Sequence, residues 1–437
     1  MQQIDMTADE LVSALLGIAG GETVCILDSC GVGHLGSHLL IAGICPVNTV
    51  EYSNDDPNVS LAVLEERLSG NNAAIFTLSY DLGYRLLGLG PPANNRSATD
   101  EPDIFVSSFD ALVIYDYDLG SGWVAGDADK CGAVMAKLRS SRGIVISEPT
   151  TPAVEVTSSF TKAEYLAAID DIRELIRCGD TYQTNLTQQL SAHLQAGNTA
   201  ENIFSRLRRD HPAPFGAFIR RGGSTVVSAS PERFFRVEDS SAISTSPIKG
   251  TRPRGTTPDE DAKLRKELLE SVKDRAENTM IVDMLRNDLG RVCDYGSVSV
   301  ETLCELEEHP TLFHLVSTIT GQLRRNTSAS DVLRALFPCG SITGAPKIST
   351  MRIIDRIETR IRGLSMGAIG YYVPGGSFGL PQTLDLSVAI RTMVIRGQIA
   401  VFNVGGGIVI DSDPGTEYAE SLTKAQALIT AIGGRLG

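Results

Sequence analysis

The feature that most constrains the fold of this chain is the way short strands alternate with tight turns in its second half. The stretch SVAIRTMVIRGQIAVFNVGGGIVIDSD, residues 387–413, contains two strand-like runs joined at residues 396–397, then a glycine cluster and another apolar run. The stretch AFIRRGGSTVVSASPERFFRVED is typical of a hairpin with a polar turn at residues 222–224. A long helical stretch follows over residues 258–289. This mixed, hairpin-rich order predicts an α+β fold with antiparallel sheets rather than a doubly wound parallel sheet.

The length of the chain predicts more than one folding unit. At 437 residues it exceeds what a single ordinary hydrophobic core serves. The composition changes at SEPTTPAVEVTSS, residues 147–159, just before a helix that Thr161 and Glu164 begin as a capping box. We therefore expect an N-terminal domain over residues 1–150, interleaved with the core and suited to a regulatory or docking role, and a main domain over residues 151–437.

Charge, hydropathy and cysteine usage exclude several classes of protein. The net charge of −14 argues against nucleic-acid binding, because a phosphate footprint needs clustered Lys and Arg. No apolar run reaches the ~18–20 residues that a membrane-spanning helix needs. The 8 cysteines are scattered without a CxxC motif, which predicts reduced, buried thiols in a cytoplasmic protein.

Two pairs of carboxylates have the spacing of a shared helix face. Asp274 and Glu277 lie three residues apart in the long helical stretch, and Glu417 and Glu420 repeat that spacing in a helix that begins at Asp413. If the two helices converge, these carboxylates suit a hard divalent cation such as Mg²⁺ beside an anionic substrate. Taken alone, the spacing is more often that of two solvated helix faces.

Two glycine-containing stretches have the composition of anion sites. Gly405, Gly406 and Gly407 stand before an apolar run, where backbone N–H groups can converge on a carboxylate or phosphate. A bulge or tight turn is the more common reason for such a cluster. FPCGSITGAPK, residues 337–347, precedes a helix whose N-terminus can receive an anion, but it lacks the ending of a phosphate-binding P-loop.

A single lysine, Lys249, stands within ISTSPIKGTRPRG, residues 243–255. Its ammonium group must reach water or find compensation, since lysine is a poor residue for a packed strand. The stretch by itself allows either a surface loop residue or an amine presented to a substrate. His314 lies in an apolar run and, by itself, is typical of a core histidine.

The ordered set of motifs outweighs each of these separate alternatives. In chain order it is GDTYQTNLTQQL, SASPERFF, SPIKGTRPRG, DRAENTMIVDMLRNDLGRV, FHLVSTITGQL, FPCGSITGAPK, MGAIGYY, AIRTMV and GGGIVIDSDPGTEYAESLTKA. Over residues 160–432 this set resembles the chorismate-utilising enzymes, which include anthranilate, aminodeoxychorismate, isochorismate and salicylate synthases. The resemblance implies two antiparallel β-sheets packed as a sandwich, helices on the outside, and a chorismate-binding catalytic site between the sheets. Residues 1–150 match only loosely.

The resemblance also implies roles for individual residues. Mg²⁺ would bridge the acidic helices and the ring carboxylate of chorismate, compensating the charge of a dianionic substrate. The implied metal ligands are Glu277 and Glu420, supported by Asp274 and Glu417. The implied substrate-binding residues are Thr251, Tyr372, Arg391, Gly405, Gly406, Gly407 and Lys424. Among them, Arg391 and Lys424 would bind the enolpyruvyl carboxylate.

Two positions separate the branches of this family. Members that add water carry a lysine base where this chain has Gln183, and a glutamine cannot act as that base at neutral pH. Anthranilate synthases have alanine where this chain has Lys249, whereas aminodeoxychorismate synthases have lysine. The resemblance thus implies that Lys249 attacks ring carbon 2 while the 4-hydroxyl leaves with Glu232 as general acid, and that ammonia then displaces the lysine. The alternative is a Lys249 that only holds a carboxylate.

The expected function is that of the aminodeoxychorismate synthase component I branch. Chorismate and ammonia would give 4-amino-4-deoxychorismate for 4-aminobenzoate and folate biosynthesis, with ammonia from a separate glutamine amidotransferase subunit or from solution. The alternative is the anthranilate synthase component I reaction. His314, a further catalytic candidate, does not separate these two branches. A non-catalytic binding subunit is disfavoured because Glu232, Glu277 and Glu420 are all present.

Overall fold

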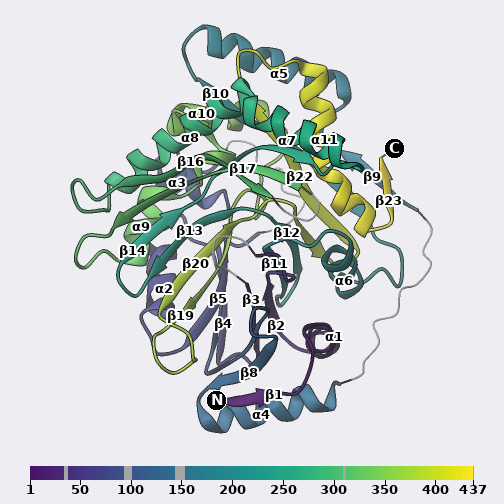
Figure 1. The fold of residues 1–437 in the computed structure, drawn as a ribbon, viewed down its shortest axis with the longest axis vertical. Helices are drawn as coiled ribbons and strands as arrows, with labels where there is room; N and C mark the ends of the chain where they lie inside the picture. Colours follow the sequence, from purple (N-terminus) through teal and green to yellow (C-terminus); the bar gives the residue numbers. More distant parts are fainter. Residues whose placement is uncertain (34–37, 93–100, 143–152, 309–311, 437) are drawn as a thin grey trace.

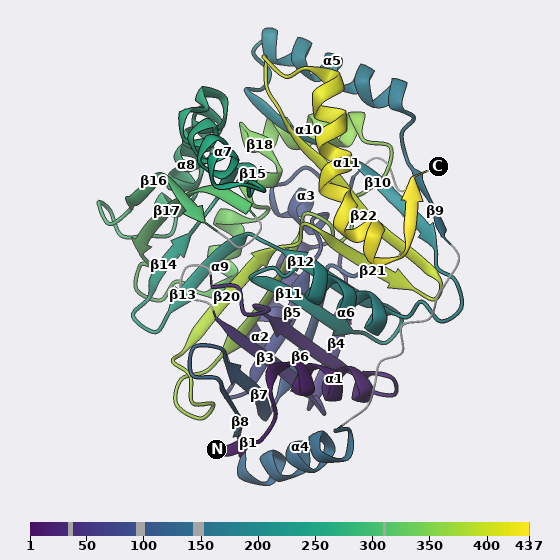
Figure 2. The ribbon, with the colours of Figure 1, turned by 45° about the vertical axis from the view of Figure 1, so that its right-hand side comes forward.

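Two β-sheets packed against each other form the centre of the molecule, and helices cover their outer faces (Figures 1 and 2). The computed structural model describes residues 1–33, 38–92, 101–142, 153–308 and 312–436. Among the strand pairs of these residues, the pair β23–β9 is parallel and the others are antiparallel. The predicted α+β class and the antiparallel sandwich with outer helices are confirmed.

Both sheets contain strands from the two ends of the chain. In spatial order the first sheet contains β1 (Gln2–Ile4), β8 (Ser121–Gly126), β7 (Ala111–Asp116), β3 (Leu39–Ile44), β2 (Val24–Asp28), β11 (Phe215–Arg220), β12 (Thr225–Ser230), β21 (Thr392–Arg396), β22 (Ile399–Ile408), β10 (Gln183–His193), β9 (Val154–Ser158) and β23 (Gly434–Leu436), and β18 (Gly344–Ala345) pairs with β10. The second contains β15 (Ile248–Pro253), β17 (Leu312–Gln322), β14 (Ala242–Thr245), β13 (Arg233–Glu238), β20 (Thr383–Val388), β19 (Ala368–Val373), β5 (Ala73–Leu78), β6 (Ile104–Phe109) and β4 (Asn48–Tyr52), and β16 (Ser299–Glu308) pairs with β17.

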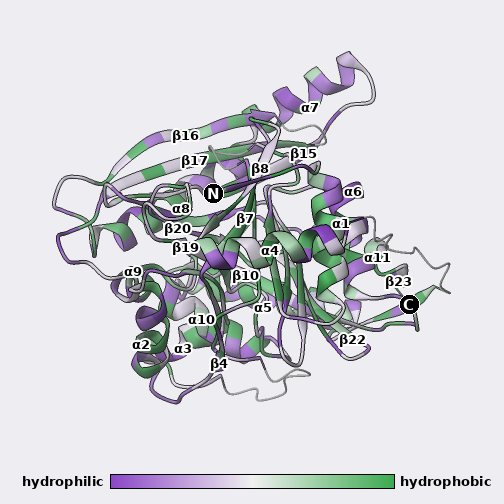
Figure 3. Ribbon diagram, turned by 90° about the horizontal axis from the view of Figure 1, so that it is seen from below, coloured by the Kyte–Doolittle hydropathy of each residue, from purple (hydrophilic) through white to green (hydrophobic). Residues whose placement is uncertain are grey.

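The helices lie on the outer faces and at one end. They are α1 (Ala8–Ala19), α2 (Pro57–Leu68), α3 (Leu82–Leu86), α4 (Ala128–Ser140), α5 (Lys162–Arg177), α6 (Ala200–Asp210), α7 (Pro258–Glu270), α8 (Val272–Gly290), α9 (Ala329–Leu336), α10 (Lys347–Ile357) and α11 (Pro414–Ala431), with a short 3₁₀ turn at Gly340–Ile342. Figure 3 shows hydrophobic residues along the central strands and α7 projecting from the body.

Alternation along the strands explains why the sheets can be covered on both faces. On β11, Ala217 and Ile219 belong to the core between the sheets, while Phe218 belongs to the core beneath the outer helices. On β12, Val226 and Val227 divide in the same way. Successive side chains of a strand point to opposite faces, so each strand contributes to two cores.

The strands of residues 1–150 complete the sheets formed by the rest of the chain. β2 pairs with β11 through Ile26 and Phe218, and β5 pairs with β19 through Phe76 and Gly370. The predicted boundary between two domains stays a prediction, because residues 143–152, which include part of the expected connection, lie outside the described residues.

The two helix starts predicted from local signals, at Thr161 and Asp413, are confirmed, but one break between helices was missed. The capping box of Thr161 and Glu164 starts α5, and Asp413 caps α11. The predicted long helix over residues 258–289 is wrong: it is two helices, α7 and α8, separated at Ser271. Ser271 has an extended backbone, and its side chain accepts a hydrogen bond from the Asp274 amide, which is the geometry of an N-cap.

The structure agrees in part with what the sequence predicted about membrane-spanning helices and about the cysteines. No helix of the described residues is long and apolar enough to cross a membrane. The cysteines are free thiols as expected, but Cys45 and Cys178 are exposed rather than buried.

Candidate active site

The two acidic helices predicted from spacing, α8 and α11, meet in the folded chain. The Lys273 ammonium at the start of α8 lies 2.8 Å from Glu417 Oε1 of α11. In Figure 2 the two helices lie on either side of β18, with β15 beside α8. Asp274, Glu277, Glu417 and Glu420 therefore belong to one cluster, which we call the acidic cluster, rather than to two separate solvated faces.

Each carboxylate of the acidic cluster is paired with a basic side chain. Glu417 contacts Lys273, and Glu277 Oε1 lies 3.9 Å from the same ammonium group. Glu420 lies 2.8 Å from Lys424. The fourth pair joins Asp274 to Arg252 at 3.1 Å.

These pairs decide how well the cluster suits a metal ion. Its carboxylate oxygens are the donors that Mg²⁺ prefers, and they come from two facing helices. As the side chains lie, no group of three or more acidic, histidine or cysteine residues within the described ranges converges tightly enough to hold a metal ion. The carboxylates are suitable ligands for Mg²⁺. For the ion to bind, it would have to replace the basic side chains that now pair with them.

Lys249 lies beside the acidic cluster on β15. Its ammonium group donates a hydrogen bond to the Ser341 carbonyl oxygen, 3.0 Å away. The next residue, Gly250, has φ +82°, and a Cβ there would lie 2.9 Å from Cβ of Asp274. Glycine at this position thus lets β15 pass close to the start of α8, which brings Lys249 to the carboxylates.

Glu232 is the buried carboxyl of the site. Its residue is 5% exposed, and Oε1 has no hydrogen-bond partner among the described residues. Burial raises the pKa of Glu232, against the lowering effect of the Lys249 ammonium. A raised pKa favours the protonated form of the carboxyl, which is the form that can donate a proton to a leaving group.

Glu277 and Glu420 differ in pKa although they belong to the same cluster. Burial raises the pKa of Glu277, and Lys249 and Lys273 only partly offset this. Burial acts on Glu420 in the same direction, but Lys424, Lys273 and Lys249 outweigh it and the pKa is lowered. Glu420 is thus held in its charged form.

Arg391 is the least engaged of the predicted anion-binding residues. It has φ +47° at the start of β21, and its carbonyl oxygen accepts a hydrogen bond from the Ala229 amide. Burial lowers its pKa. Its guanidinium makes no hydrogen bond or ion pair with any residue that the structure describes. Arg391 follows Val388 by three residues, and the Val388 amide donates a hydrogen bond to the Glu232 carbonyl oxygen.

The three glycines lie inside β22 and not ahead of a strand, which corrects the sequence prediction. A Cβ at Gly405 would lie 1.9 Å from the Leu186 carbonyl oxygen, and one at Gly407 would lie 2.3 Å from Gln183 Nε2. Gly406 faces the cluster: a Cβ there would lie 3.5 Å from both Glu417 Oε2 and Lys424 Nζ. The glycines therefore let β10 and the acidic cluster approach β22 closely.

Thr251 and His314 are cross-strand neighbours of β15 and β17, and Thr251 Oγ1 lies 2.8 Å from His314 Nδ1. His314 is buried and Thr251 is exposed. Thr251 lies two residues beyond Lys249 on β15.

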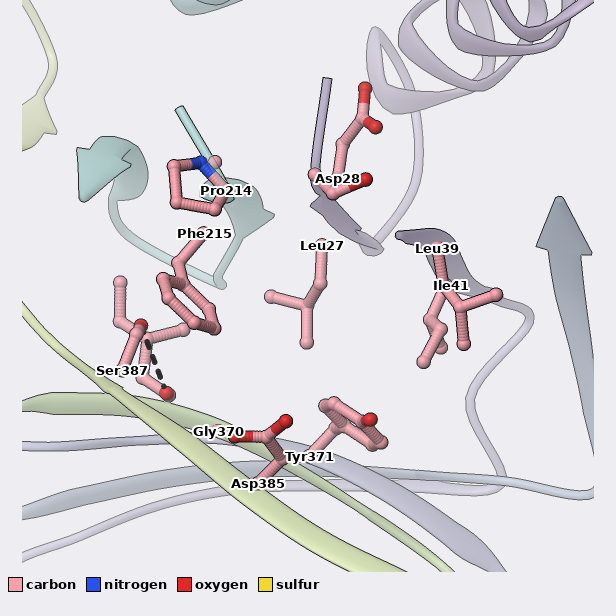
Figure 4. Close-up of a pocket in the computed structure, with 13 residues that line it drawn as sticks. Leu27, Asp28, Leu39, Ile41, Pro214, Phe215, Gly370, Tyr371, Asp385 and Ser387 are labelled. Atoms are coloured by element: carbon pink, nitrogen blue, oxygen red, sulfur yellow. Dashed lines mark hydrogen bonds between the residues drawn. The ribbon is translucent and has the colours of Figure 1, made fainter. Parts of the chain in front are cut away.

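Tyr372 lies apart from the other predicted residues. It packs half-buried against the outer core of the second sheet, where the Glu65 carboxylate of α2 is its neighbour. Its neighbour Tyr371 points to the opposite face and lines a cavity between the two sheets. Figure 4 shows this inter-sheet cavity with Leu27, Phe215 and Asp385 around it. None of the predicted site residues lines it.

The FPCGSITGAPK stretch, residues 337–347, contains Ser341, whose carbonyl oxygen accepts the hydrogen bond from Lys249. Lys347, the first residue of α10, donates hydrogen bonds to Asp288 Oδ2 of α8 and to the Leu336 carbonyl oxygen, at 2.7 and 2.8 Å. The buried Arg362 donates to the Ile342 carbonyl oxygen. These contacts hold the loop that carries Ser341, a residue that sequence reasoning did not single out. Lys273 and Arg252 were also missed, since nothing local distinguishes them from surface basic residues.

Comparison with known proteins identifies the family of this chain. The family model for a chorismate binding enzyme matches residues 37–430. This chain belongs to the chorismate binding enzyme family. It is 40% identical over 368 residues to aminodeoxychorismate synthase component 1 of Escherichia coli (strain K12), covering 84% of this chain and 78% of that protein.

Two further proteins place the chain within the family. It is 46% identical over 275 residues to aminodeoxychorismate synthase of Streptomyces griseus, which covers 62% of this chain but only 37% of that protein. Among solved structures, anthranilate synthase component I from Streptococcus pneumoniae TIGR4 superposes with a TM-score of 0.77 at 27% identity, over 91% of this chain and 93% of the other.

Proposed function

We propose that this chain converts chorismate and ammonia to 4-amino-4-deoxychorismate and water, the reaction of the aminodeoxychorismate synthase branch. The observation that carries the proposal is the position of Lys249: its amine is hydrogen-bonded to Ser341, and its charge acts on the pKa of the buried Glu232 and of Glu277. The identity to relatives named aminodeoxychorismate synthase supports it.

The proposed chemistry follows from the placement of these two side chains. Lys249, neutral when it reacts, forms a bond to ring carbon 2 while the carbon 4–oxygen bond breaks. Glu232 gives its proton to the departing hydroxyl, which leaves as water. Ammonia then forms a bond to carbon 4, and the bond from carbon 2 to Lys249 breaks, which returns the amine. The low exposure of Glu232 supports its role as the proton donor.

Arg391 and Lys424 supply the positive charge for the carboxylates of the substrate. Arg391 has no competing partner among the described residues, and Lys424 is held at 3.2 Å from the Gly405 carbonyl oxygen. Mg²⁺, which we propose Asp274, Glu277, Glu417 and Glu420 hold when it is bound, would supply further charge compensation for a carboxylate.

We propose that ammonia comes from a separate glutamine amidotransferase subunit. The designation component 1 of the Escherichia coli relative supports a second component. If so, the chain alone uses ammonium salts, and glutamine becomes a nitrogen donor only when the amidotransferase is added.

Product identification tests the proposed reaction. The chain is incubated with chorismate, Mg²⁺ and ammonium, with and without an added aminodeoxychorismate lyase, and products are separated by liquid chromatography with mass detection. We expect 4-amino-4-deoxychorismate from the chain alone, and 4-aminobenzoate only with the lyase.

The second candidate is anthranilate formation, favoured by the superposition on an anthranilate synthase component I. Fluorescent anthranilate without a lyase would establish it in place of the first. Unchanged chorismate with either nitrogen donor would indicate a non-catalytic binding subunit.

A further inference from the structure

Lys273 is in an unfavourable place for a cation on its own helix. It is the second residue of α8, directly after the exposed Val272, and the helix begins at the N-cap Ser271. The N-terminal turn of a helix carries a partial positive charge, so acidic side chains are favoured there and basic ones are not. A lysine at this position needs compensation from elsewhere in the fold.

The compensation comes from the facing helix. The Lys273 ammonium lies 2.8 Å from Glu417 Oε1 of α11 and 3.9 Å from Glu277 Oε1 of α8. The Glu417 side chain is only 4% exposed, whereas that of Lys273 is 46% exposed. The charged end of Lys273 thus reaches a buried carboxylate while the rest of the side chain stays at the surface.

Lys273 differs from the other cations of the acidic cluster. Lys424 pairs with Glu420 four residues away on its own helix, and Arg252 pairs with Asp274 of α8. Among the ion pairs of the described residues, Lys273 is the cation that contacts carboxylates of both acidic helices. It therefore compensates charge between α8 and α11, in addition to the pairs that Lys424 and Arg252 make.

A divalent cation held by Glu277 and Glu417 would lie close to the Lys273 ammonium, and the two positive charges would repel each other. Glu417 Oε1 already accepts from Lys273 and from Ser412 Oγ, at 2.8 and 2.7 Å. A carboxylate oxygen has few lone-pair sites, so an additional metal ligand bond there replaces a hydrogen bond. The exposed stem of Lys273 gives it a route to solvent when it is replaced.

We propose that Lys273 is a built-in counter-cation of the acidic cluster, and that it competes with the divalent metal for Glu417 and Glu277. The proposal rests on the proposed function for the expectation that these carboxylates hold Mg²⁺. Lys273 keeps α8 and α11 together in the metal-free protein, and metal binding moves it away from Glu417. The metal affinity of the wild type is accordingly lower than the carboxylates alone would provide.

The test compares Mn²⁺ binding, a probe for Mg²⁺ that electron paramagnetic resonance detects directly, between full-length variants. For Lys273→Met, which keeps the length but removes the charge, we expect binding about tenfold tighter than for the wild type. The matched control is Lys266→Met on α7, where an exposed lysine pairs with Glu270 at 3.8 Å. We expect its affinity to stay within about twofold, because exposed charges at a distance are screened.

Two further measurements keep the test decisive. Lys273→Arg retains the charge, and we expect its Mn²⁺ affinity to stay close to that of the wild type. If Lys273→Met does not fold, Lys273→Gln, which can still donate to Glu417, takes its place with the same expected direction. Thermal unfolding adds a second readout: the metal-free Lys273→Met protein unfolds at a lower temperature than the wild type, and saturating Mn²⁺ raises that temperature by more in the variant.

An affinity for Lys273→Met equal to or weaker than that of the wild type would overturn the competition. The product assay with wild-type protein, chorismate and ammonium separates this failure from that of the proposed function. If the wild type forms the product but Lys273→Met binds Mn²⁺ no more tightly, only the role proposed for Lys273 is wrong. Tighter Mn²⁺ binding without product supports the role of Lys273 and removes the proposed reaction.

Discussion

Glu232 and Glu420 are two glutamates of one site in opposite environments. Glu232 is buried, has an oxygen without a hydrogen-bond partner among the described residues, and has a raised pKa. Glu420 has a side chain that is 48% exposed, pairs with Lys424, and has a lowered pKa. Within one site, the fold thus favours the protonated form of one carboxyl and the charged form of another. Burial dominates the pKa of Glu232, whereas the charges of Lys424, Lys273 and Lys249 outweigh burial at Glu420.

The largest expected effect comes from replacing Lys249, the proposed nucleophile. For Lys249→Ala we expect formation of 4-amino-4-deoxychorismate to fall by at least about a thousandfold, because the nucleophile is lost. The lyase-coupled assay measures it, with Lys266→Ala as the control on exposed α7. Activity within a few-fold of the wild type would reduce Lys249 to an anion-binding residue.

The next effect tests the proton donor directly. For Glu232→Gln we expect kcat to fall by about 10²–10⁴, the usual contribution of a general acid. Since the protonated carboxyl is the active form, wild-type activity should fall as pH rises through the raised pKa of Glu232. The variant should lack that limb of the pH profile. An unaltered profile would assign the limb to another group.

A smaller effect is expected for a residue that binds the substrate without taking part in the chemical step. For Arg391→Ala we expect KM for chorismate to rise about tenfold to a hundredfold, the value of a charged hydrogen bond, with a smaller change in kcat. Arg391→Lys should recover only part of the affinity, because lysine lacks the planar fork of arginine. A fall in kcat alone would place Arg391 away from the ground-state carboxylate.

The smallest effect concerns Gly406, the glycine of β22 beside Glu417 and Lys424. Gly406→Ala places a Cβ in ordinary contact with Glu417 and Lys424, so we expect the midpoint of thermal unfolding to change little. Gly405→Ala is the matched contrast, because its Cβ would lie 1.9 Å from the Leu186 carbonyl oxygen and must displace backbone. We expect the Gly405 variant to unfold at a clearly lower temperature. Equal stabilities would show that β22 adjusts freely.

Much of the fold could be predicted from local patterns. The hairpin turns at residues 222–224 and 396–397, the capping box at Thr161 and the N-cap at Asp413 all depend on neighbours within a few residues. The break at Ser271 was missed because the helical pattern continues through it, and only the side chain of Ser271 accepting from Asp274 shows that a new helix begins.

The candidate site could be predicted only in part of its membership, since Ser341, Lys273 and Arg252 were missed and Tyr372 lies apart. Spacing placed Asp274 with Glu277 and Glu417 with Glu420, and the motif set joined them to Lys249 and Glu232. It could not show that Lys273, Lys424 and Arg252 neutralise the carboxylates, because those partners are chosen by the packing of α8, α11 and β15. Nor could it tell that Tyr371 and Tyr372, adjacent in sequence, face different cores.

The amino-acid sequence by itself determined the antiparallel α+β class and the helix starts at Thr161 and Asp413, because these depend on short-range patterns and on chemical type. Only the tertiary structure decided the environment of each carboxylate. Burial and the nearest cation depend on segments that meet from opposite ends of the chain, and those two quantities divide Glu232 from Glu420.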